Sequence, residues 1–317
     1  MIVHVLRYRH EGHIRWGVCR GLEVTPIPGE FASTGDLIRG VSLVDLDALR
    51  GAPVAFADVA LLSPVTRDQQ FVCQGANYRQ HMIESGVDPD AKSFNMIFTK
   101  AASCIVPADA DVVMPKRVRF LDYEVELGLV LRRPMTGPCD VTDANLHEYV
   151  AGAVIVNDYS ARDVQIPEMQ FYKGKSFRTF GPVGPRLALV DRESIGELGR
   201  LELRLTVNGE LRQSDSTANL VHRPAPTLSE LSRVQDFDAG DLLATGTPAG
   251  CALSIPSPTK QRLAALIPEA KKWELFLAAQ AKRTQYLKPG DVVEASVRSA
   301  DGKVDLGVQR NRIVAES

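Results

Sequence analysis

The sequence predicts a mainly β fold with α+β elements. We divide it into a small N-terminal β-rich domain at residues 1–66 and a larger domain at residues 67–317. Short runs of alternating apolar and polar residues, bounded by turn residues, recur through most of the chain. Helix-like stretches break this pattern at about residues 252–286. The length of 317 residues exceeds the usual single-core size of about 150–250 residues, so two domains are allowed.

The composition is that of an ordinary globular protein, with 44% hydrophobic and 24% charged residues. A net charge of -2 gives no argument for nucleic acid or a membrane surface as a partner. No apolar run approaches a membrane span and the N-terminus lacks a signal-peptide pattern, so we expect a cytoplasmic protein. The five cysteines are scattered without a CxxC pair, which favours reduced thiols over disulfides or a zinc site.

Turn residues place the elements along the chain. The first domain begins with two alternating strands joined by a turn at residues 10–12, and Ser42 is a candidate N-cap for a short helix that follows. The second domain begins with a strand at Phe71–Cys73 and then a helix. Further along, Asn208 and Gly209 form the strongest hairpin signal in the sequence.

An acidic strand is predicted at residues 120–131, FLDYEVELGLVL. Apolar residues alternate there with Asp122, Glu124 and Glu126, so three carboxylates would lie on one face and repel one another. A bound cation would relieve this repulsion. The alternative is a solvated edge strand with an acidic outer face.

Asp158 follows an apolar run at Val150–Val156, which predicts a second buried strand. Two glutamates on one strand face and this distant aspartate would together supply hard oxygen ligands. Such ligands suit Mg²⁺, Mn²⁺ or Ca²⁺ better than zinc.

The helix after Phe71–Cys73 carries His81 and Glu84, whose i, i+3 spacing puts both on one face. A carboxylate beside an imidazole can fix its tautomer and raise its basicity, as a general base requires. The alternative is an ordinary surface pair. After Asp158 comes a density of polar side chains that packing does not explain: Arg162, Asp163, Gln165, Lys173, Lys175 and Arg178.

Seven motifs in order give the chain a resemblance to a known family: GANYRQHMIES, DYEVELG, VNDYSARDVQ, KGKSF, GDLLATGTPAG, LKPGDVVEA and RNRIVAE. From about Leu61 to Glu316 the chain resembles the fumarylacetoacetate hydrolase family. The resemblance implies that family's mixed β-sandwich roll, a homodimer and a small-molecule keto-acid substrate.

The resemblance also implies roles for individual residues. The divalent cation, Mg²⁺ or Mn²⁺ with Ca²⁺ as an alternative, would be held by Glu124, Glu126 and Asp158, with Asp122 supporting them. The catalytic residues would be His81, Glu84 and Lys175. Substrate contacts would come from Gln165, Thr247, Tyr78 and Arg178.

These groups predict hydrolysis of a carbon–carbon bond in an acylpyruvate or related β-diketo acid. His81, oriented by Glu84, would activate water, and the cation together with Lys175 would stabilise the enolate that leaves. The alternatives are an oxaloacetate-type decarboxylase and a keto–enol or double-bond isomerase of aromatic-degradation intermediates. A more remote alternative is a non-catalytic metal-binding scaffold.

The chain departs from the family pattern in two places. Arg178 stands where many members carry an aspartate, and we expect it either to contact a distal substrate carboxylate or to turn outward into a salt bridge. Residues 252–286 form a helical insertion, with helices predicted at 258–268 and 269–283. The insertion could cover the active site, extend a dimer interface or cover an apolar edge.

Overall fold

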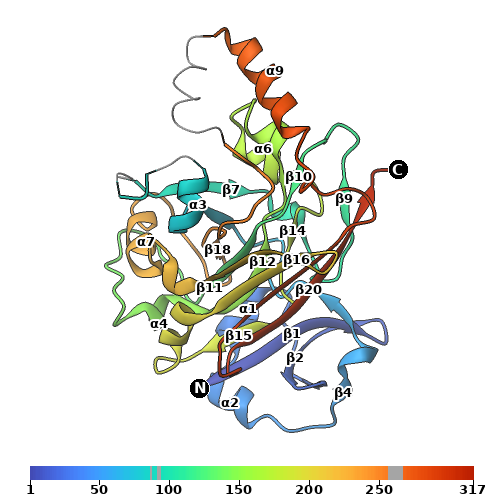
Figure 1. Ribbon diagram of the computed structural model, residues 1–317. Coiled ribbons are helices and arrows are strands. Elements are labelled where there is room, and N and C mark those ends of the chain that lie inside the picture. Colours follow the sequence, from blue (N-terminus) through green and yellow to red (C-terminus); the bar gives the residue numbers. More distant parts are fainter. Residues whose placement is uncertain (86–87, 91–93, 256–266) are drawn as a thin grey trace.

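Two β-sheets packed against each other form the body of the molecule in the computed structural model, which describes residues 1–85, 88–90, 94–255 and 267–317 (Figure 1). The larger sheet has 11 strands in the order β4-β3-β2-β1-β15-β12-β11-β18-β6-β7, with β5 also paired to β1. Its strands are β1 (Ile2–His10), β2 (His13–Arg20), β3 (Glu23–Pro26), β4 (Val54–Ala55), β5 (Ala60–Leu62), β6 (Phe71–Gly75), β7 (Met96–Lys100), β11 (Val125–Leu131), β12 (Val150–Asn157), β15 (Leu187–Val190) and β18 (Leu242–Ala244).

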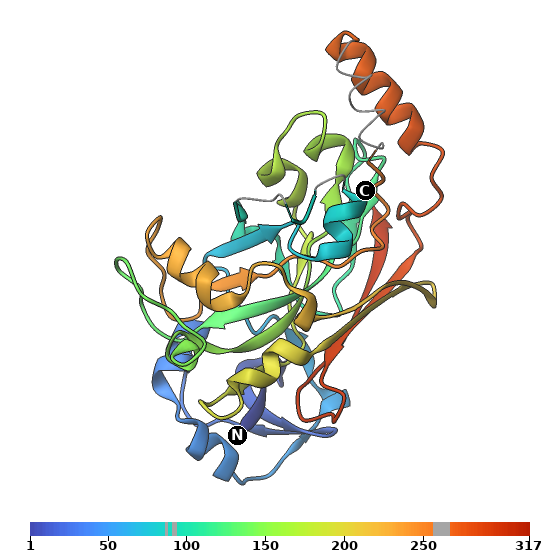
Figure 2. The same ribbon diagram turned by 60° about the vertical axis from the view of Figure 1, so that its left-hand side comes forward.

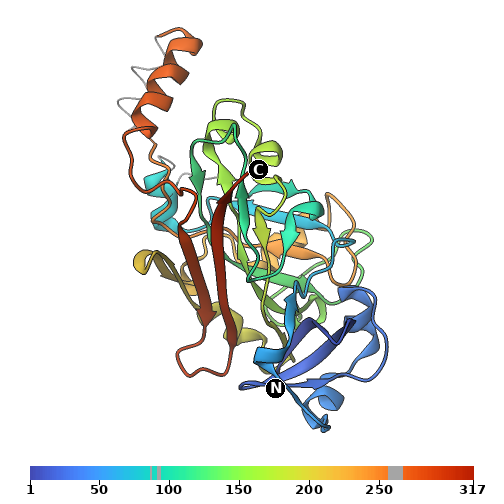
Figure 3. The same ribbon diagram turned by 90° about the vertical axis from the view of Figure 1, so that its right-hand side faces the viewer.

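The smaller sheet runs along one side of the molecule, where β19 and β20 are its long strands (Figures 2 and 3). Its five strands, in the order β17-β16-β19-β20-β9, are β9 (Val112–Met114), β16 (Glu202–Val207), β17 (Glu210–Ser216), β19 (Val292–Arg298) and β20 (Asp305–Ala315). Two short pairs complete the strands: β8 (Ile105–Val106) with β14 (Gly181–Pro182), and β10 (Leu121–Asp122) with β13 (Ser160–Ala161).

Short helices lie at the margins of the sheets. The α-helices are α1 (Thr34–Gly40), α2 (Leu43–Ala48), α3 (Arg79–Glu84), α4 (Leu146–Tyr149), α5 (Arg162–Gln165), α6 (Phe171–Lys175), α7 (Pro224–Leu231) and α9 (Glu269–Gln280). Short 3₁₀ helices lie at Phe56–Asp58, Ala102–Cys104, Ile195–Arg200 and Thr217–Asn219. The fold is thus mainly β, as the sequence predicts.

Local sequence signals explain several of these elements. At the first hairpin, Glu11 and Gly12 have φ of 50° and 80°, the left-handed values that a tight turn needs. Asn208 and Gly209 do the same for the β16–β17 hairpin, with φ of 52° and 82°. The Ser42 side chain accepts from Asp45 N at the start of α2, which confirms the predicted N-cap.

The main core lies between the two sheets. Leu127 and Leu129 of β11 belong to the same buried cluster as Leu203 and Leu205 of β16. A second buried cluster covers the opposite face of the large sheet and includes residues of the N-terminal strands. Both faces of β11 are therefore buried, as in the interior of a layered protein.

This burial corrects two expectations about the acidic segment. The strand predicted at residues 120–131 is split into β10 and β11, with Tyr123 and Glu124 between them. The alternative of a solvated edge strand is wrong, because β11 lies between β12 and β18 and all its residues are buried.

The large sheet crosses the predicted domain boundary. Strand β1 pairs antiparallel with β15, with Ile2 opposite Val190 and Val5 opposite Leu187. The N-terminal strands therefore extend the sheet that carries the acidic segment. The boundary at residue 66 stays a prediction.

Helix α9 projects from the end of the molecule near α6 in all three views (Figures 1, 2 and 3). It covers most of the helix predicted at 269–283, and its buried residues are Phe276 and Gln280. The helix predicted at 258–268 falls, apart from its last two residues, outside the described residues.

Candidate active site

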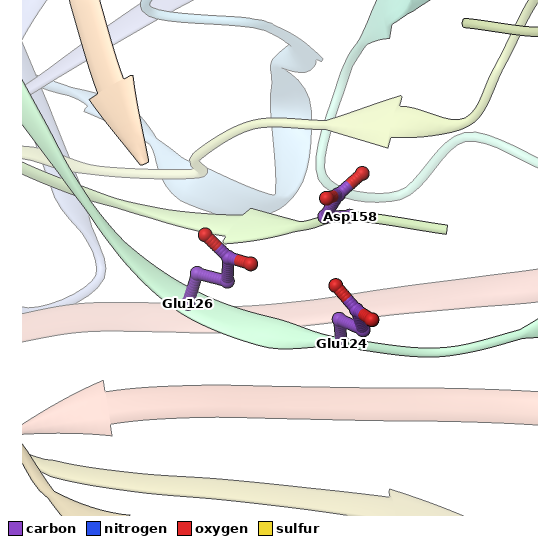
Figure 4. A group of neighbouring side chains, drawn as sticks. All are labelled: Glu124, Glu126 and Asp158. Carbon is purple, nitrogen blue, oxygen red and sulfur yellow. The ribbon is translucent and has the colours of Figure 1, made fainter. Parts of the chain in front are cut away.

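Three buried carboxylates converge where β11 and β12 meet (Figure 4). Glu126 lies on β11, Glu124 directly precedes that strand and Asp158 directly follows β12. The antiparallel register sets Val125 opposite Asn157, and Asp158 N donates to Glu124 O at 2.8 Å. One oxygen from each of the three side chains lies within 4.8 Å of the others. The structure thus brings together the metal ligands expected from the sequence.

Two buried lysines form ion pairs with two of the three acids, Glu124 and Asp158. Lys175 Nζ donates to Glu124 Oε2 at 2.7 Å and to Asp158 Oδ2 at 2.5 Å. Lys100 Nζ donates to the other Asp158 oxygen at 2.5 Å and to Phe180 O at 2.8 Å. Asp158 is therefore held by an ammonium group on each oxygen.

Arg162 at the start of α5 links Glu124 of the triad to Asp122 and Gln165. Its Nη2 donates to Glu124 Oε1 at 2.5 Å, its Nε to Asp122 Oδ2 at 2.8 Å and its Nη1 to Gln165 Oε1 at 2.8 Å. Asp122 also accepts from three backbone N–H groups, those of Tyr123, Ala252 and Leu253. With both oxygens engaged in this way, Asp122 supports Arg162 rather than joining the triad.

Burial and neighbouring charges move the pKa values of the acids in opposite directions. Burial raises the pKa of Glu124, but the Lys175 and Arg162 cations outweigh it and bring the value down to about 2. Burial and the charges of Asp158 and Glu124 raise the pKa of Glu126, and Lys175 offsets this only in part. For Lys175, burial lowers the pKa, while Asp158 and Glu124 outweigh it and keep the ammonium charged.

The donor chemistry fits a hard divalent cation. All three side chains offer carboxylate oxygens, the ligands preferred by Mg²⁺, Mn²⁺ and Ca²⁺, and no nitrogen or sulfur donor belongs to the group. Lys175 bridges two of the three acids, so its ammonium supplies the positive charge that a cation would otherwise bring.

A cavity of about 200 Å³ opens above the triad. Its polar lining consists of Gln74, His81, Ser85, Glu124, Glu126, Arg162, Gln165, Lys175 and Thr247. Its apolar lining consists of Met96, Phe98, Ile166, Phe171, Leu253 and Ile255, with Gly75 and Ala76 completing the wall. Charged groups and an apolar wall therefore share one small space.

His81 reaches this cavity from α3, but its partner is not where the sequence suggests. The His81 side chain is half-buried, and its Nδ1 is shielded from solvent without a hydrogen-bond partner among the described residues. Glu84 Oε2 instead accepts from Gly250 N at 3.1 Å. The pKa of His81 is lowered, mainly because burial desolvates the side chain. Its imidazole is therefore neutral near pH 7.

The predicted substrate contacts divide into two groups. Gln165 and Thr247 line the cavity; Thr247 Oγ1 donates to Val125 O at 3.0 Å and accepts from Gln213 Nε2 at 2.8 Å. Tyr78 lies in the hydrophobic core and Arg178 is exposed. Neither belongs to the described lining of the cavity, and within the described ranges Arg178 forms no salt bridge.

A close helix contact sets the position of Lys175. A Cβ on Gly174 would lie 2.7 Å from Gln165 Cβ and 2.9 Å from Gln165 Cα. Only glycine therefore lets α6 approach α5 closely enough to bring Lys175 between Glu124 and Asp158.

Sequence reasoning missed Lys100 and gave no specific role to Arg162. The signal for Lys100 was a charged residue at the end of an otherwise apolar strand, MIFTK, where burial requires a partner. Arg162 lies in the polar stretch after Asp158, but nothing in its spacing shows that one guanidinium contacts three side chains.

Comparison with known proteins identifies the family of this site. The family described as fumarylacetoacetate (FAA) hydrolase C-terminal matches residues 70–314, which is more than half of the chain. The chain belongs to the fumarylacetoacetate hydrolase family. This confirms the resemblance that the seven motifs indicate.

Relatives within the fumarylacetoacetate hydrolase family carry more specific names. The chain is 36% identical over 215 residues to an oxaloacetate tautomerase of Bacillus subtilis, covering 67% of this chain and 69% of the relative. It is 33% identical over 260 residues to a mitochondrial oxaloacetate tautomerase of Homo sapiens, covering 81% and 70%.

A solved structure shows the same fold over the whole chain. The fumarylacetoacetate hydrolase of the psychrophile Exiguobacterium antarcticum superposes with a TM-score of 0.76 at 29% identity, covering 99% of this chain and 100% of that one. This confirms the predicted family fold.

None of the helices in the described ranges is long and apolar enough to cross a membrane.

Proposed function

We propose that the protein is an enzyme that interconverts the keto and enol forms of a small 2-oxo acid, with oxaloacetate as the first substrate to test. Two relatives named oxaloacetate tautomerases, each matched over two thirds or more of both chains, support this proposal. The size of the cavity also supports it, because about 200 Å³ is below the range of about 300–1,000 Å³ that holds drug-sized ligands.

Tautomerisation moves one proton between C3 and the oxygen on C2, and negative charge develops on that oxygen in between. His81 is neutral near pH 7 and its Nδ1 has no partner among the described residues, so it can accept the C3 proton and return it to oxygen. Lys175 and Arg162 place two cations at the polar end of the cavity, where they stabilise the developing charge. A divalent cation held by Glu124, Glu126 and Asp158 would add electrostatic stabilisation there.

The position of Glu84 favours tautomerisation over hydrolysis. Hydrolysis needs a water molecule and an oriented base that removes its proton, whereas tautomerisation needs no water. Glu84 contacts Gly250 N, and His81 Nδ1 has no partner in the part of the chain that the structure describes, so the imidazole is not arranged as a carboxylate-supported base toward water.

The test is the rate of enol–keto exchange of oxaloacetate, followed by the ultraviolet absorbance of the enol, with Mg²⁺- or Mn²⁺-loaded protein. We expect catalysis that EDTA and His81→Ala both abolish. Exchange at the uncatalysed rate would refute the proposal. Release of carbon dioxide and pyruvate as the main outcome would identify a decarboxylase instead.

Hydrolysis of an acylpyruvate is the second candidate function. It is favoured by the presence of His81 and Glu84 one turn apart on α3, so a side-chain rotation at Glu84 would bring its carboxylate toward the imidazole. Water would add to the distal carbonyl, the adjacent carbon–carbon bond would break, and the enolate of pyruvate would take up a proton. Formation of acetate and pyruvate from acetylpyruvate would establish this activity.

A further inference from the structure

Part of the apolar wall of the cavity comes from a segment that follows the TGTPAG motif. Leu253 and Ile255 of this wall belong to the short segment 252–255, which leads from the end of the TGTPAG motif toward α9. Two groups of contacts hold the segment, one from the acidic site and one from the C-terminal end of α9.

On the side of the active site, Asp122 holds the segment. Its carboxylate accepts from Ala252 N at 2.8 Å and from Leu253 N at 2.9 Å. The same carboxylate accepts from Arg162 Nε, and Arg162 contacts Glu124. Asp122 and Arg162 therefore connect the backbone at Leu253 to the charged end of the cavity.

On the other side, Gln280 at the end of α9 and Arg283, which follows that helix, hold the segment. Gln280 Nε2 donates to Ser254 O at 2.8 Å, and its Oε1 accepts from Ser254 N at 3.4 Å and from Tyr286 OH at 2.8 Å. Arg283 Nε donates to Ala252 O at 2.6 Å. Gln280 is 2% exposed although most of α9 faces solvent, so its amide is committed to this contact.

We propose that α9 and the residues directly after it form a specificity element: Gln280 and Arg283 position residues 252–255 so that Leu253 and Ile255 select, among 2-oxo acids longer than oxaloacetate, those with an uncharged apolar substituent. The described cations of the cavity, Arg162 and Lys175, are both engaged at its polar end, and Met96, Phe98, Ile166 and Phe171 extend the apolar wall. A substituent that reaches this wall gains affinity by burying carbon, whereas a carboxylate that reaches it meets no cation among the described residues. The choice of substrate class rests on the proposed function, but the positioning of the wall does not.

The test compares two ligands by calorimetry in the presence of Mg²⁺: oxalate, a two-carbon dianion too short to reach Leu253, and 2-oxohexanoate, whose alkyl chain reaches the wall. We expect Gln280→Ala to weaken 2-oxohexanoate binding by about tenfold, the scale of an apolar pocket contact, and to leave oxalate binding unchanged. Leu275→Ala, on the exposed face of α9, is the matched control and should change neither. Equal losses for both ligands would overturn the proposal.

A double variant shows whether Gln280 acts through Leu253. Leu253→Ala alone should weaken 2-oxohexanoate selectively, and Gln280→Ala added to it should cause little further loss, because the side chain that Gln280 positions is already gone. Fully additive losses would contradict a positioning role. If Gln280→Ala folds poorly, Leu253→Ala alone still tests the contact between the ligand and the apolar wall.

Hydrogen exchange separates this inference from the proposed function. Gln280→Ala should speed amide exchange of residues 252–255, and Leu275→Ala should not. If wild-type protein binds neither ligand, the proposed substrate class fails, while faster exchange in Gln280→Ala still supports the positioning role. Unchanged exchange would overturn that role.

Discussion

Lys175 and Asp158 form a fully buried ion pair, with Nζ 2.5 Å from Oδ2. The pair is held from both sides, because Lys100 binds the other Asp158 oxygen and Glu124 binds the same ammonium. Breaking one partner of a buried pair leaves an uncompensated charge, which costs far more than losing a surface pair. The triad thus depends on Lys175 whenever no other cation is bound.

Lys175→Met should therefore destabilise the protein in EDTA by about 3–5 kcal/mol, measured by urea unfolding. Addition of Mn²⁺ should restore more stability in the variant than in the wild type, because the ion replaces the missing positive charge. Lys173→Met is the matched control, since the Lys173–Glu168 pair is exposed and solvent screens it. Equal losses in the two variants would show that the Lys175 charge is not needed.

Affinity for a divalent cation should rise with pH. The raised pKa of Glu126 means that a proton competes for this carboxylate, and metal binding must displace it. Mn²⁺ binding, followed by calorimetry at several pH values, should strengthen as the pH rises and should release protons. Glu126→Gln should bind the ion more weakly and lose this dependence, whereas a pH-independent wild-type affinity would contradict the prediction.

Variants at His81 and Glu84 should separate the two candidate reactions. His81→Ala should lower tautomerase turnover by about 10²–10⁴-fold, the usual contribution of a general base, and leave Mn²⁺ binding intact. Glu84→Gln should retain most tautomerase activity, because Glu84 contacts Gly250 N and not His81. Any acylpyruvate hydrolysis should be lost in both variants. Parallel losses of both activities in Glu84→Gln would show that the carboxylate supports His81 in the working enzyme.

Arg178→Ala should leave KM unchanged for substrates with one or two carboxylates. The side chain is exposed and outside the described lining of the cavity. A side chain that does not line the cavity makes no contact with the bound substrate, so its removal takes no binding energy away. A loss confined to the dicarboxylate substrate would instead place Arg178 against its distal carboxylate.

His4 should make the protein less stable in mild acid. Burial, followed by the charge of Arg186, lowers the pKa of His4 from 6.5 to about 4, and its Nε2 accepts from Asp305 N at 3.1 Å. The unfolded chain therefore takes up a proton between these values while the folded chain does not. Stability is full above pH 6.5 and falls toward pH 4, by about 3 kcal/mol at most.

His4→Gln should flatten this part of the pH profile of urea unfolding, because glutamine can accept the same hydrogen bond without titrating. His13→Gln, which removes an exposed histidine from the neighbouring strand, is the control. A profile that keeps its slope in His4→Gln would assign the acid sensitivity to other groups.

The fold and the triad were predictable because each rests on a repeating or local signal. Alternation marked the strands, Asn208-Gly209 marked a hairpin, and the motifs placed Glu124, Glu126 and Asp158 together. The split between β10 and β11 was not predictable from alternation, because it depends on the Asn157 side chain, whose Oδ1 accepts from Glu124 N.

The contacts that complete the site come from residues far apart in the chain. Lys100 approaches Asp158 only because β6, β18, β11 and β12 are neighbours in one sheet, with β7 beyond them. The Glu84–Gly250 contact likewise joins a helix to a distant loop. Spacing along the sequence carries no signal for either. The homodimer and the cytoplasmic location stay predictions.

The pairing of β1 with β15 has a consequence for shortened forms of the protein. A chain that began at residue 67 would keep the whole family-matched region but would leave the Leu187–Val190 strand as a bare, apolar sheet edge. The unpaired backbone groups of such an edge can form hydrogen bonds with a strand of another molecule, which leads to self-association. The first 66 residues therefore cover an apolar sheet edge of the family-matched region, and we expect their removal to promote aggregation.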